Sequence, residues 1–272
     1  MKISFIGGGN MASALIAGLA GKVAQAADIH VVDPSQDALA RLGEQYGVGT
    51  APGIGAAVGT SDVIVLAVKP QQMRDVALRL QAELTNRPLV LSIAAGIRGA
   101  DLSRWLGGYG AIVRTMPNTP ALIGQGITGM VAMAGVSDAQ KDAAGRILQA
   151  VGKTVWLDEE ALIDPVTAVS GSGPAYVFYF LEAMQQAALD MGLSAQQGRE
   201  LALETFIGAA QLAAQSEESL ETLRQRVTSK GGTTHAAITS MQAAGVKEAI
   251  VAAMQAAAAR GRELGDELGR DA

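Results

Sequence analysis

The sequence predicts an α/β protein in which a doubly wound parallel sheet is followed by an all-helical region. Through about residue 157, short β-branched runs alternate with helical stretches, as in a parallel sheet covered by helices. From about Glu160 onward this β signal disappears, and Ala, Leu, Met, Gln and Glu dominate. We therefore expect one domain at residues 1–159 and a helical domain at residues 160–272.

Hydrophobic patterning and glycine or serine punctuation place the individual elements. The expected strands are residues 2–6, 28–32, 63–66, 89–92, 111–115, 128–133 and 154–157. The expected helices of the first domain are 11–19, 36–46, 70–84, 99–106 and 138–150. Those of the second domain are 175–191, 194–214, 220–227, 234–244 and 246–268.

Composition excludes several classes of function. The net charge of −5 comes without a block of like charges, so we expect no nucleic-acid partner. There is no cysteine, and His30 and His235 are the two histidines, so we expect no metal centre. No apolar run approaches the roughly 20 residues of a membrane span. The first strand begins at Lys2 and leaves no room for a signal peptide, so we expect no membrane association and a cytoplasmic location.

A glycine-rich turn joins the first strand to the first helix. Gly7, Gly8, Gly9, Asn10, Met11 and Ala12 have the pattern G-x-G-x-x-A. In this pattern Gly7 permits the tight turn, Gly9 lets the backbone approach a pyrophosphate, and Ala12 lets the helix lie close to the strand. Asp33 follows the second strand about 20 residues later, as in dinucleotide-binding domains. The alternative is a purely structural turn, but this context predicts a Rossmann domain that binds a nicotinamide cofactor.

The end of the second strand leaves the choice of cofactor open. A carboxylate at Asp33 hydrogen-bonds the adenosine ribose and repels a 2′-phosphate, which favours NAD over NADP. Ser35, however, can donate to a phosphate if Asp33 points away. No arginine stands beside Asp33 to neutralise it, and Arg41 is the nearest downstream.

Three further loops follow strands at the edge where ligands bind. Lys69, in the run Ala67–Pro70, either meets cofactor or substrate charge or is a solvated lysine at a helix start. The small residues of Ser92–Gly96 either leave space for a flat nicotinamide ring or pack closely. Asn118, held between two prolines, either meets the nicotinamide or orders its loop.

The run Ser229–His235, SKGGTTH, is an unusual helix start. Its glycines and hydroxyls precede a helical segment, so free backbone N–H groups and the positive end of the helix dipole can hold a small carboxylate. The alternative is a well-capped helix without a ligand. Farther upstream, the segment 177–188 is apolar on more than one face, which indicates that a second subunit covers it.

Together these segments resemble pyrroline-5-carboxylate reductase over almost the whole chain. The matching motifs are IGGGNMA, AVKP, SIAAG, MPNTP, AVSGSGPAY and, most specifically, LRQRVTSKGGTTHAAITSMQ at residues 223–242. The resemblance implies a helical domain that interleaves with that of a second subunit, in homodimers that often assemble further. It also implies reduction of 1-pyrroline-5-carboxylate, a small imino acid, to L-proline by NAD(P)H in the final step of proline biosynthesis.

The resemblance also assigns residues to the site. The cofactor-binding positions are Gly7, Gly8, Gly9, Asn10, Met11, Ala12, Ala67, Val68, Lys69, Pro70, Ile93, Ala94 and Ala95, with Asn118 nearby and Asp33 and Ser35 at the adenosine end. On the substrate side the resemblance assigns Glu217, Thr233 and Thr234, and the helix start described above adds Ser229, Gly231 and Gly232. Ile54 departs from the asparagine of some relatives, which leaves the cofactor preference open. Because Asp33 at a surface turn can rotate into solvent, where its repulsion of a phosphate is weak, we expect both NADP(H) and NAD(H) to serve, with NADPH modestly favoured on family grounds.

The reaction needs a hydride donor, an anchor for the carboxylate and a proton on the ring nitrogen. We expect backbone N–H groups at Ser229–Thr233 to hold the carboxylate and Thr234 to hydrogen-bond the ring nitrogen as the catalytic residue. His235 should face elsewhere. One alternative, a hydroxyacid dehydrogenase, usually has a lysine on a helix of the second domain, and residues 176–214 contain none. Another alternative is a dinucleotide-sensing regulator without turnover.

Overall fold

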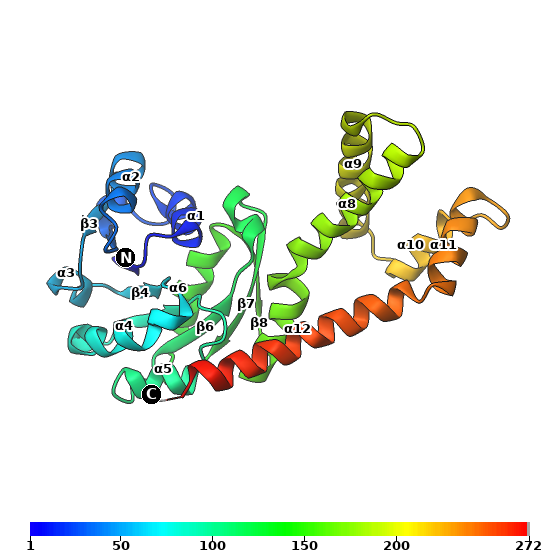
Figure 1. Ribbon diagram of the computed structural model, residues 1–272. Helices are drawn as coiled ribbons and strands as arrows, with labels where there is room; N and C mark the ends of the chain where they lie inside the picture. Colours follow the sequence, from blue (N-terminus) through cyan, green and yellow to red (C-terminus); the bar gives the residue numbers. More distant parts are fainter. Residues whose placement is uncertain (271–272) are drawn as a thin grey trace. The chain divides into compact units, whose positions relative to one another are not determined.

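The computed structural model describes residues 1–270, which form two compact units. The first unit comprises residues 1–172 together with the chain from Ala256 onward, and the second comprises residues 173–255. The domain boundary expected between residues 159 and 160 remains a prediction. Figure 1 shows the sheet of the first unit and the helices of the second.

Within the described residues, the first unit contains an eight-stranded sheet in the order β3-β2-β1-β4-β5-β6-β7-β8. The strands are β1 (Ile3–Ile6), β2 (Ile29–Val32), β3 (Gly49–Ala51), β4 (Val63–Leu66), β5 (Leu89–Ser92), β6 (Ile112–Met116), β7 (Gly126–Ala132) and β8 (Gly152–Trp156). β1 lies centrally, with Ile3 opposite both Ile29 and Val63 in parallel register. This is the doubly wound arrangement that the alternating pattern predicts.

Two features of the sheet differ from the expectation. β7 runs antiparallel to β6, because the two strands are joined only by the short 3-10 turn η4 (Thr119–Ile123), whereas a parallel pair needs a crossover of a dozen or more residues. The sheet is therefore mostly, not wholly, parallel. β3 was not expected, since Gly49 and Thr50 are exposed and three residues carry no clear alternation.

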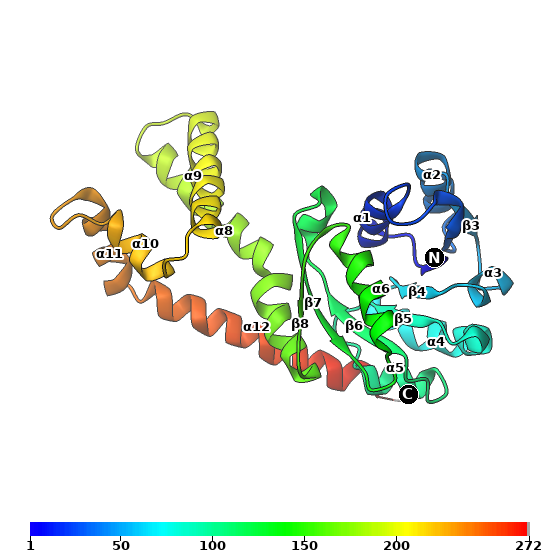
Figure 2. The same ribbon diagram turned by 180° about the vertical axis from the view of Figure 1, so that it is seen from behind.

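Helices cover both faces of the sheet, as Figures 1 and 2 show. One core cluster lies under α1 (Asn10–Leu19), α2 (Gln36–Tyr46) and α6 (Asp138–Gln149), and a second lies under α3 (Ala56–Gly59), α4 (Met73–Leu80) and α5 (Gly99–Trp105). The single helix expected at 70–84 is wrong in its ends. Only α4 is α-helical there, between the 3-10 turns η2 (Pro70–Gln72) and η3 (Gln81–Asn86), and Leu84 has non-helical dihedral angles.

The second unit is helical. It contains α8 (Gly173–Asp190), α9 (Ala195–Gln215), α10 (Leu220–Arg226), α11 (Thr233–Ala243) and the first part of α12 (Val246–Leu268). Ser194 begins α9 with a capping box to Gln197, which satisfies two otherwise unpaired donors. The rings of Phe180 and Phe206 lie 6.5 Å apart between α8 and α9, which run side by side in both views. No helix within residues 1–270 is long and apolar enough to cross a membrane.

The end of α12 packs within the first unit. Arg98 lies between β5 and α5, and its guanidinium donates to the Arg262 carbonyl over 3.1 Å and pairs with Asp266 at 2.7 Å. Leu264 and Leu268 lie against the backbone of Gly96, where φ is +74°. The short segments η5 (Glu160–Leu162), α7 (Ile163–Val166) and the π-helical turn Thr167–Gly171 also belong to this unit.

Candidate functional site

The carboxyl ends of three neighbouring strands bring the predicted cofactor loops together. The Gly7 N–H donates to the Val32 carbonyl over 2.8 Å, and the Ala67 N–H donates to the Ile6 carbonyl over 2.8 Å. A Cβ at Gly7 would lie 2.6 Å from the Ala67 carbonyl oxygen, and φ there is +107°, so only glycine fits. The Ile93 N–H donates to the Leu66 carbonyl over 3.2 Å. The segments at 7–12, 67–70 and 93–95 therefore start side by side at one edge of the sheet.

The start of α1 fits the pyrophosphate of a dinucleotide. Gly9 is the N-cap residue, and no side chain caps the helix. Apart from Gly9 and its two chain neighbours, no heavy atom of residues 1–270 lies within 4 Å of the position that a Cβ of residue 9 would take, so the space beside Gly9 is open. The first intrahelical bond runs from the Ser13 N–H to the Gly9 carbonyl, so the N–H groups of the first turn have no acceptor within the helix. Ala12 is 1% exposed and lets α1 pack closely on the sheet. An anion is favoured here by these N–H groups and by the helix dipole.

Asp33 turns toward the glycine-rich turn. Its Oδ2 accepts the Gly8 N–H over 2.7 Å, and its Oδ1 accepts the Ser35 N–H over 2.8 Å. The arrangement in which Asp33 points away to leave Ser35 alone with a phosphate is therefore not the one adopted. The Ser35 hydroxyl oxygen also accepts the Ala38 N–H at the start of α2.

Arg41 places a cation beside the glycine-rich turn, which its position in the sequence did not indicate. Its guanidinium lies 3.5 Å from the Gly8 carbonyl and 3.5 Å from the Ser13 hydroxyl. Arg41 lies in α2, eight positions after Asp33. Both side chains contact the backbone of Gly8, so the helix brings Arg41 close to the turn to which Asp33 is bonded. Ile54, at the position that departs from some relatives, packs partly buried against the core under α4.

Both ends of the Asn118 side-chain amide bond to the backbone of nearby segments. Asn118 is 8% exposed, its Oδ1 accepts the Ile127 N–H over 3.0 Å, and its Nδ2 donates to the Ser170 carbonyl over 3.1 Å. These bonds match the loop-ordering alternative, and a nicotinamide contact remains a prediction. Lys69 is exposed before η2, which leaves both of its alternatives open. Ala94 is 5% exposed and packs closely.

The predicted substrate residues lie in the second unit. α11 starts at Thr233, Gly232 is its N-cap residue without a side-chain cap, and Gly231 takes φ +77°. The Gly232 N–H donates to the Ser229 carbonyl over 3.0 Å, which closes a tight turn before the helix. Thr233 and Thr234 are exposed in the first turn, so hydroxyls and free N–H groups face the same solvent-accessible end.

Glu217 lies between α9 and α10 and is exposed. The carboxylate of its neighbour Glu218 instead pairs with Arg226 at 2.5 Å, and the Glu218 backbone N–H donates to the Ser216 hydroxyl oxygen. The structure thus leaves the Glu217 carboxylate accessible.

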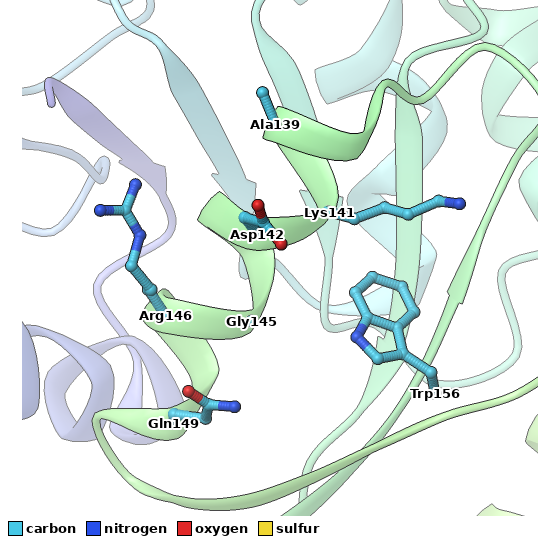
Figure 3. Close-up of a pocket in the computed structure, with 7 residues that line it drawn as sticks. All are labelled: Ala139, Lys141, Asp142, Gly145, Arg146, Gln149 and Trp156. Carbon is cyan, nitrogen blue, oxygen red and sulfur yellow. The ribbon is translucent and has the colours of Figure 1, made fainter.

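A surface pocket between α6 and β8 contains none of the predicted site residues. It is lined by Ala139, Lys141, Asp142, Gly145, Arg146, Gln149 and Trp156 (Figure 3). The Lys141 side chain extends over the Trp156 side, Arg146 points to the other side, and Asp142 lies between them, so the cations do not converge on one point. Nor do residues 1–270 hold a cluster of three or more His, Cys, Asp or Glu side chains suited to a metal ion.

Arg114 and Glu160 belong to none of the motifs that predicted the site. Arg114 is 4% exposed in β6, and its Nη1 donates to Glu160 Oε1 over 2.9 Å. A charged residue within the buried strand IVRTM is a signal for such a pair, because arginine is rarely buried without a partner. The sequence does not reveal which carboxylate it meets.

Comparison with known proteins decides the family. Residues 160–264 match the model for pyrroline-5-carboxylate reductase dimerisation, and residues 2–96 match that for NADP oxidoreductase, coenzyme F420-dependent. A pyrroline-5-carboxylate reductase of Pseudomonas aeruginosa is 47% identical over 99% of this chain and 98% of its own length. The chain belongs to the pyrroline-5-carboxylate reductase family. The expected fold, family and oxidoreductase class are thereby confirmed.

Solved structures of this family agree. The reductase from Coxiella burnetii has a TM-score of 0.91 and 40% identity, covering 97% of this chain and 98% of its own. The Plasmodium falciparum enzyme, determined with NADP bound, has a TM-score of 0.87 and 28% identity over 97% and 98% of the two chains.

Proposed function

We propose that the residues assembled above carry out the reaction of the pyrroline-5-carboxylate reductase family. As a member of that family, the protein reduces 1-pyrroline-5-carboxylate to L-proline with NAD(P)H, the final step of proline biosynthesis. The observation that carries the assignment of the substrate site is the start of α11, where Ser229–Thr234 offers uncapped N–H groups and two exposed hydroxyls. A hydroxyacid dehydrogenase or a dinucleotide sensor does not require this terminus.

NADP(H) and NAD(H) are the cofactors of this chain. The N–H groups at Gly9–Ala12 would hold the pyrophosphate, Asp33 and Ser35 would lie at the adenosine ribose, and Ala67–Pro70, Ile93–Ala95 and Asn118 would line the path toward the nicotinamide. When bound, the reduced cofactor supplies a hydride for the imine carbon. Arg41 beside the glycine-rich turn offsets part of the negative charge of Asp33, which supports acceptance of a 2′-phosphate.

The substrate is held by the second unit. The backbone N–H groups of the Ser229–Thr233 turn that have no acceptor within residues 1–270, that of Thr233 among them, would bind the carboxylate, with Glu217 on the substrate side. Thr234 would donate a hydrogen bond to the ring nitrogen as it becomes an amine. A protonated iminium arrives from solvent, so no general acid with a shifted pKa is needed.

The protein is a homodimer through its C-terminal helices in this proposal, and a larger homo-oligomer is compatible with it. In the single chain α8 leaves Phe178 60% and Tyr179 73% exposed, which is apolar area that a second copy would bury. A cytoplasmic location remains a prediction from the sequence.

The decisive test is steady-state oxidation of NADPH and of NADH by the purified protein, with and without 1-pyrroline-5-carboxylate. Oxidation that depends on this imino acid, with formation of proline, supports the proposal. Oxidation that requires a hydroxy- or keto-acid instead would support a dehydrogenase of similar fold. Cofactor binding without any turnover would identify a sensor.

A further inference from the structure

A partly buried ion pair joins three parts of the first unit outside the residues assigned to the site. Arg114 Nη1 donates to Glu160 Oε1 over 2.9 Å, and the side chains are 5% and 27% exposed. The same carboxylate oxygen accepts the backbone N–H of Gly99 over 2.6 Å. Glu160 is the first residue of η5 and Gly99 the first of α5, so one oxygen atom ties β6, η5 and the start of α5 together.

The pair acts on the loop that connects β5 to α5. Ile112, two residues before Arg114, packs in the core under α4 and α5, so Arg114 points to that same face of the sheet. The loop leaves β5 at Ile93, whose N–H is held by the Leu66 carbonyl over 3.2 Å. Its other end is held at Gly99 by Glu160. Between these two anchors lie Ala94 and Ala95, which the proposed function assigns to the cofactor.

Stability alone is a poor reason for this pair. Removing the Arg114 charge from water has a large desolvation cost, and a well-packed apolar side chain often stabilises such a position equally or better. Arg114 Nε is also buried without a hydrogen-bond partner among residues 1–270, and an unpaired donor of this kind is destabilising. Apolar side chains cannot accept the Gly99 N–H. The Glu160 carboxylate can, and Arg114 in β6 holds that carboxylate in position.

We propose that Glu160 and Arg114 are positioning residues that hold residues 93–98 in the conformation that receives the nicotinamide ring. This inference rests on the proposed assignment of Ile93–Ala95 to the cofactor. Glu160 acts through the Gly99 N–H, and Arg114 acts through Glu160. A shift of about 1 Å in a group that aligns the reactants lowers the rate on the order of a hundredfold, so a loosened loop lowers kcat.

The test compares four variants with the wild type. Glu160→Ala removes the acceptor, and Glu160→Gln retains an oxygen that can accept from Gly99. Glu159→Ala is the matched control, because Glu159 is the exposed neighbour. Arg114→Met combined with Glu160→Leu removes both charges, so that the protein folds without a buried, unpaired cation.

Each variant is measured in four ways. Steady-state kinetics give kcat and the Michaelis constant for the imino-acid substrate, and a binding assay gives the dissociation constant of NADPH. A thermal scan gives the melting temperature, and amide hydrogen exchange is followed at residues 93–99. We expect the double variant to melt near the wild type, to exchange faster at 93–99, and to lose roughly 10- to 100-fold in kcat, while the Michaelis constant changes by less than about threefold. NADPH affinity stays within about threefold, because the start of α1 lies outside the loop. Glu160→Gln should restore most of the kcat lost in Glu160→Ala, and Glu159→Ala should match the wild type.

A double variant with wild-type kcat and unchanged exchange at 93–99 overturns the inference. So does a variant whose loss of activity is explained by its unfolded fraction alone. If the wild type fails to reduce 1-pyrroline-5-carboxylate, the proposed reaction fails. Exchange at 93–99 with and without NADPH then still decides the positioning inference: NADPH protection of this loop in the wild type, lost in the double variant, supports it, and equal protection in both overturns it.

Discussion

Thr234 is the residue on which the proposed chemistry most depends. It lies exposed in the first turn of α11, where its hydroxyl can donate to the ring nitrogen of the substrate. Thr234→Ala should lower kcat/KM by roughly 10- to 1000-fold, as expected when one polar contact in a desolvated site is lost. Cofactor affinity should change little. Thr239→Ala, an exposed substitution later in the same helix, is the control, and full activity of Thr234→Ala would exclude this role.

Asp33 has a double role that the structure makes testable. In the proposed site its carboxylate would repel a 2′-phosphate, and it also accepts the Gly8 N–H over 2.7 Å and the Ser35 N–H over 2.8 Å. Asp33→Ala should therefore raise kcat/KM for NADPH relative to NADH, and more so at low salt, where the repulsion is less screened. It should also raise the Michaelis constants of both cofactors, because the glycine-rich turn loses a hydrogen bond.

The comparison for Asp33 is Asp37→Ala, which removes an exposed carboxylate from the first turn of α2, the helix that follows Asp33. Kinetics with both cofactors at two salt concentrations provide the measurement. An unchanged NADPH to NADH ratio in Asp33→Ala would mean that this carboxylate does not lie near the adenosine ribose.

At the scale of elements, the end of α12 supports the turn between β5 and α5. Gly265 is buried, and a Cβ there would lie 2.9 Å from Arg98 Nε. Gly265→Leu should displace Arg98 from Asp266 and from the Arg262 carbonyl. Overpacking costs about 1–3 kcal/mol, and about 2–4 °C in melting temperature per kcal/mol is typical for chains of this size.

We therefore expect the melting temperature of Gly265→Leu to fall by several degrees in a thermal scan. Arg262→Leu adds the same side chain at an exposed position of the same helix and should leave the melting temperature nearly unchanged. Equal melting temperatures for the two variants would mean that α12 does not support this turn.

At the scale of the whole molecule, α8 determines the expected assembly. Ala188 is the buried residue of this helix in the single chain, while Val177, Phe178, Tyr179, Phe180 and Met184 are 40%, 60%, 73%, 37% and 38% exposed. Such an apolar surface exceeds what soluble monomers normally show, so the smallest stable species should be a dimer. Light scattering at micromolar concentration measures this. A well-folded monomer there would contradict the expectation, and Phe178→Glu should weaken the dimer.

The sequence by itself determined the family, most of the elements in their order, and the motifs on which the proposed site rests. These properties are local: the turn after β1, the helix start at Thr233 and the switch in periodicity near Glu160 are each encoded by residues adjacent in the chain. Helix α2 at 36–46, strand β4 at 63–66 and helix α12 at 246–268 therefore have the expected bounds. The short strand β3 was missed because it has no strong periodic signal. The antiparallel direction of β7 was missed because strand periodicity does not encode direction, which here follows from the short connection to β6.

Only the tertiary structure decided which groups meet. Arg114 and Glu160 are 46 positions apart, and Arg98 and Arg262 are 164 apart. Asp33 bonds Gly8 across 25 positions, and Asn118 bonds Ser170 across 52. A polar side chain displays its type in the sequence, but its partner is chosen by burial, because a donor or acceptor removed from water takes whichever complementary group the packed strands and helices bring within reach. The motifs could therefore be identified in the sequence, whereas the contacts that hold them in place could be identified only in the folded structure.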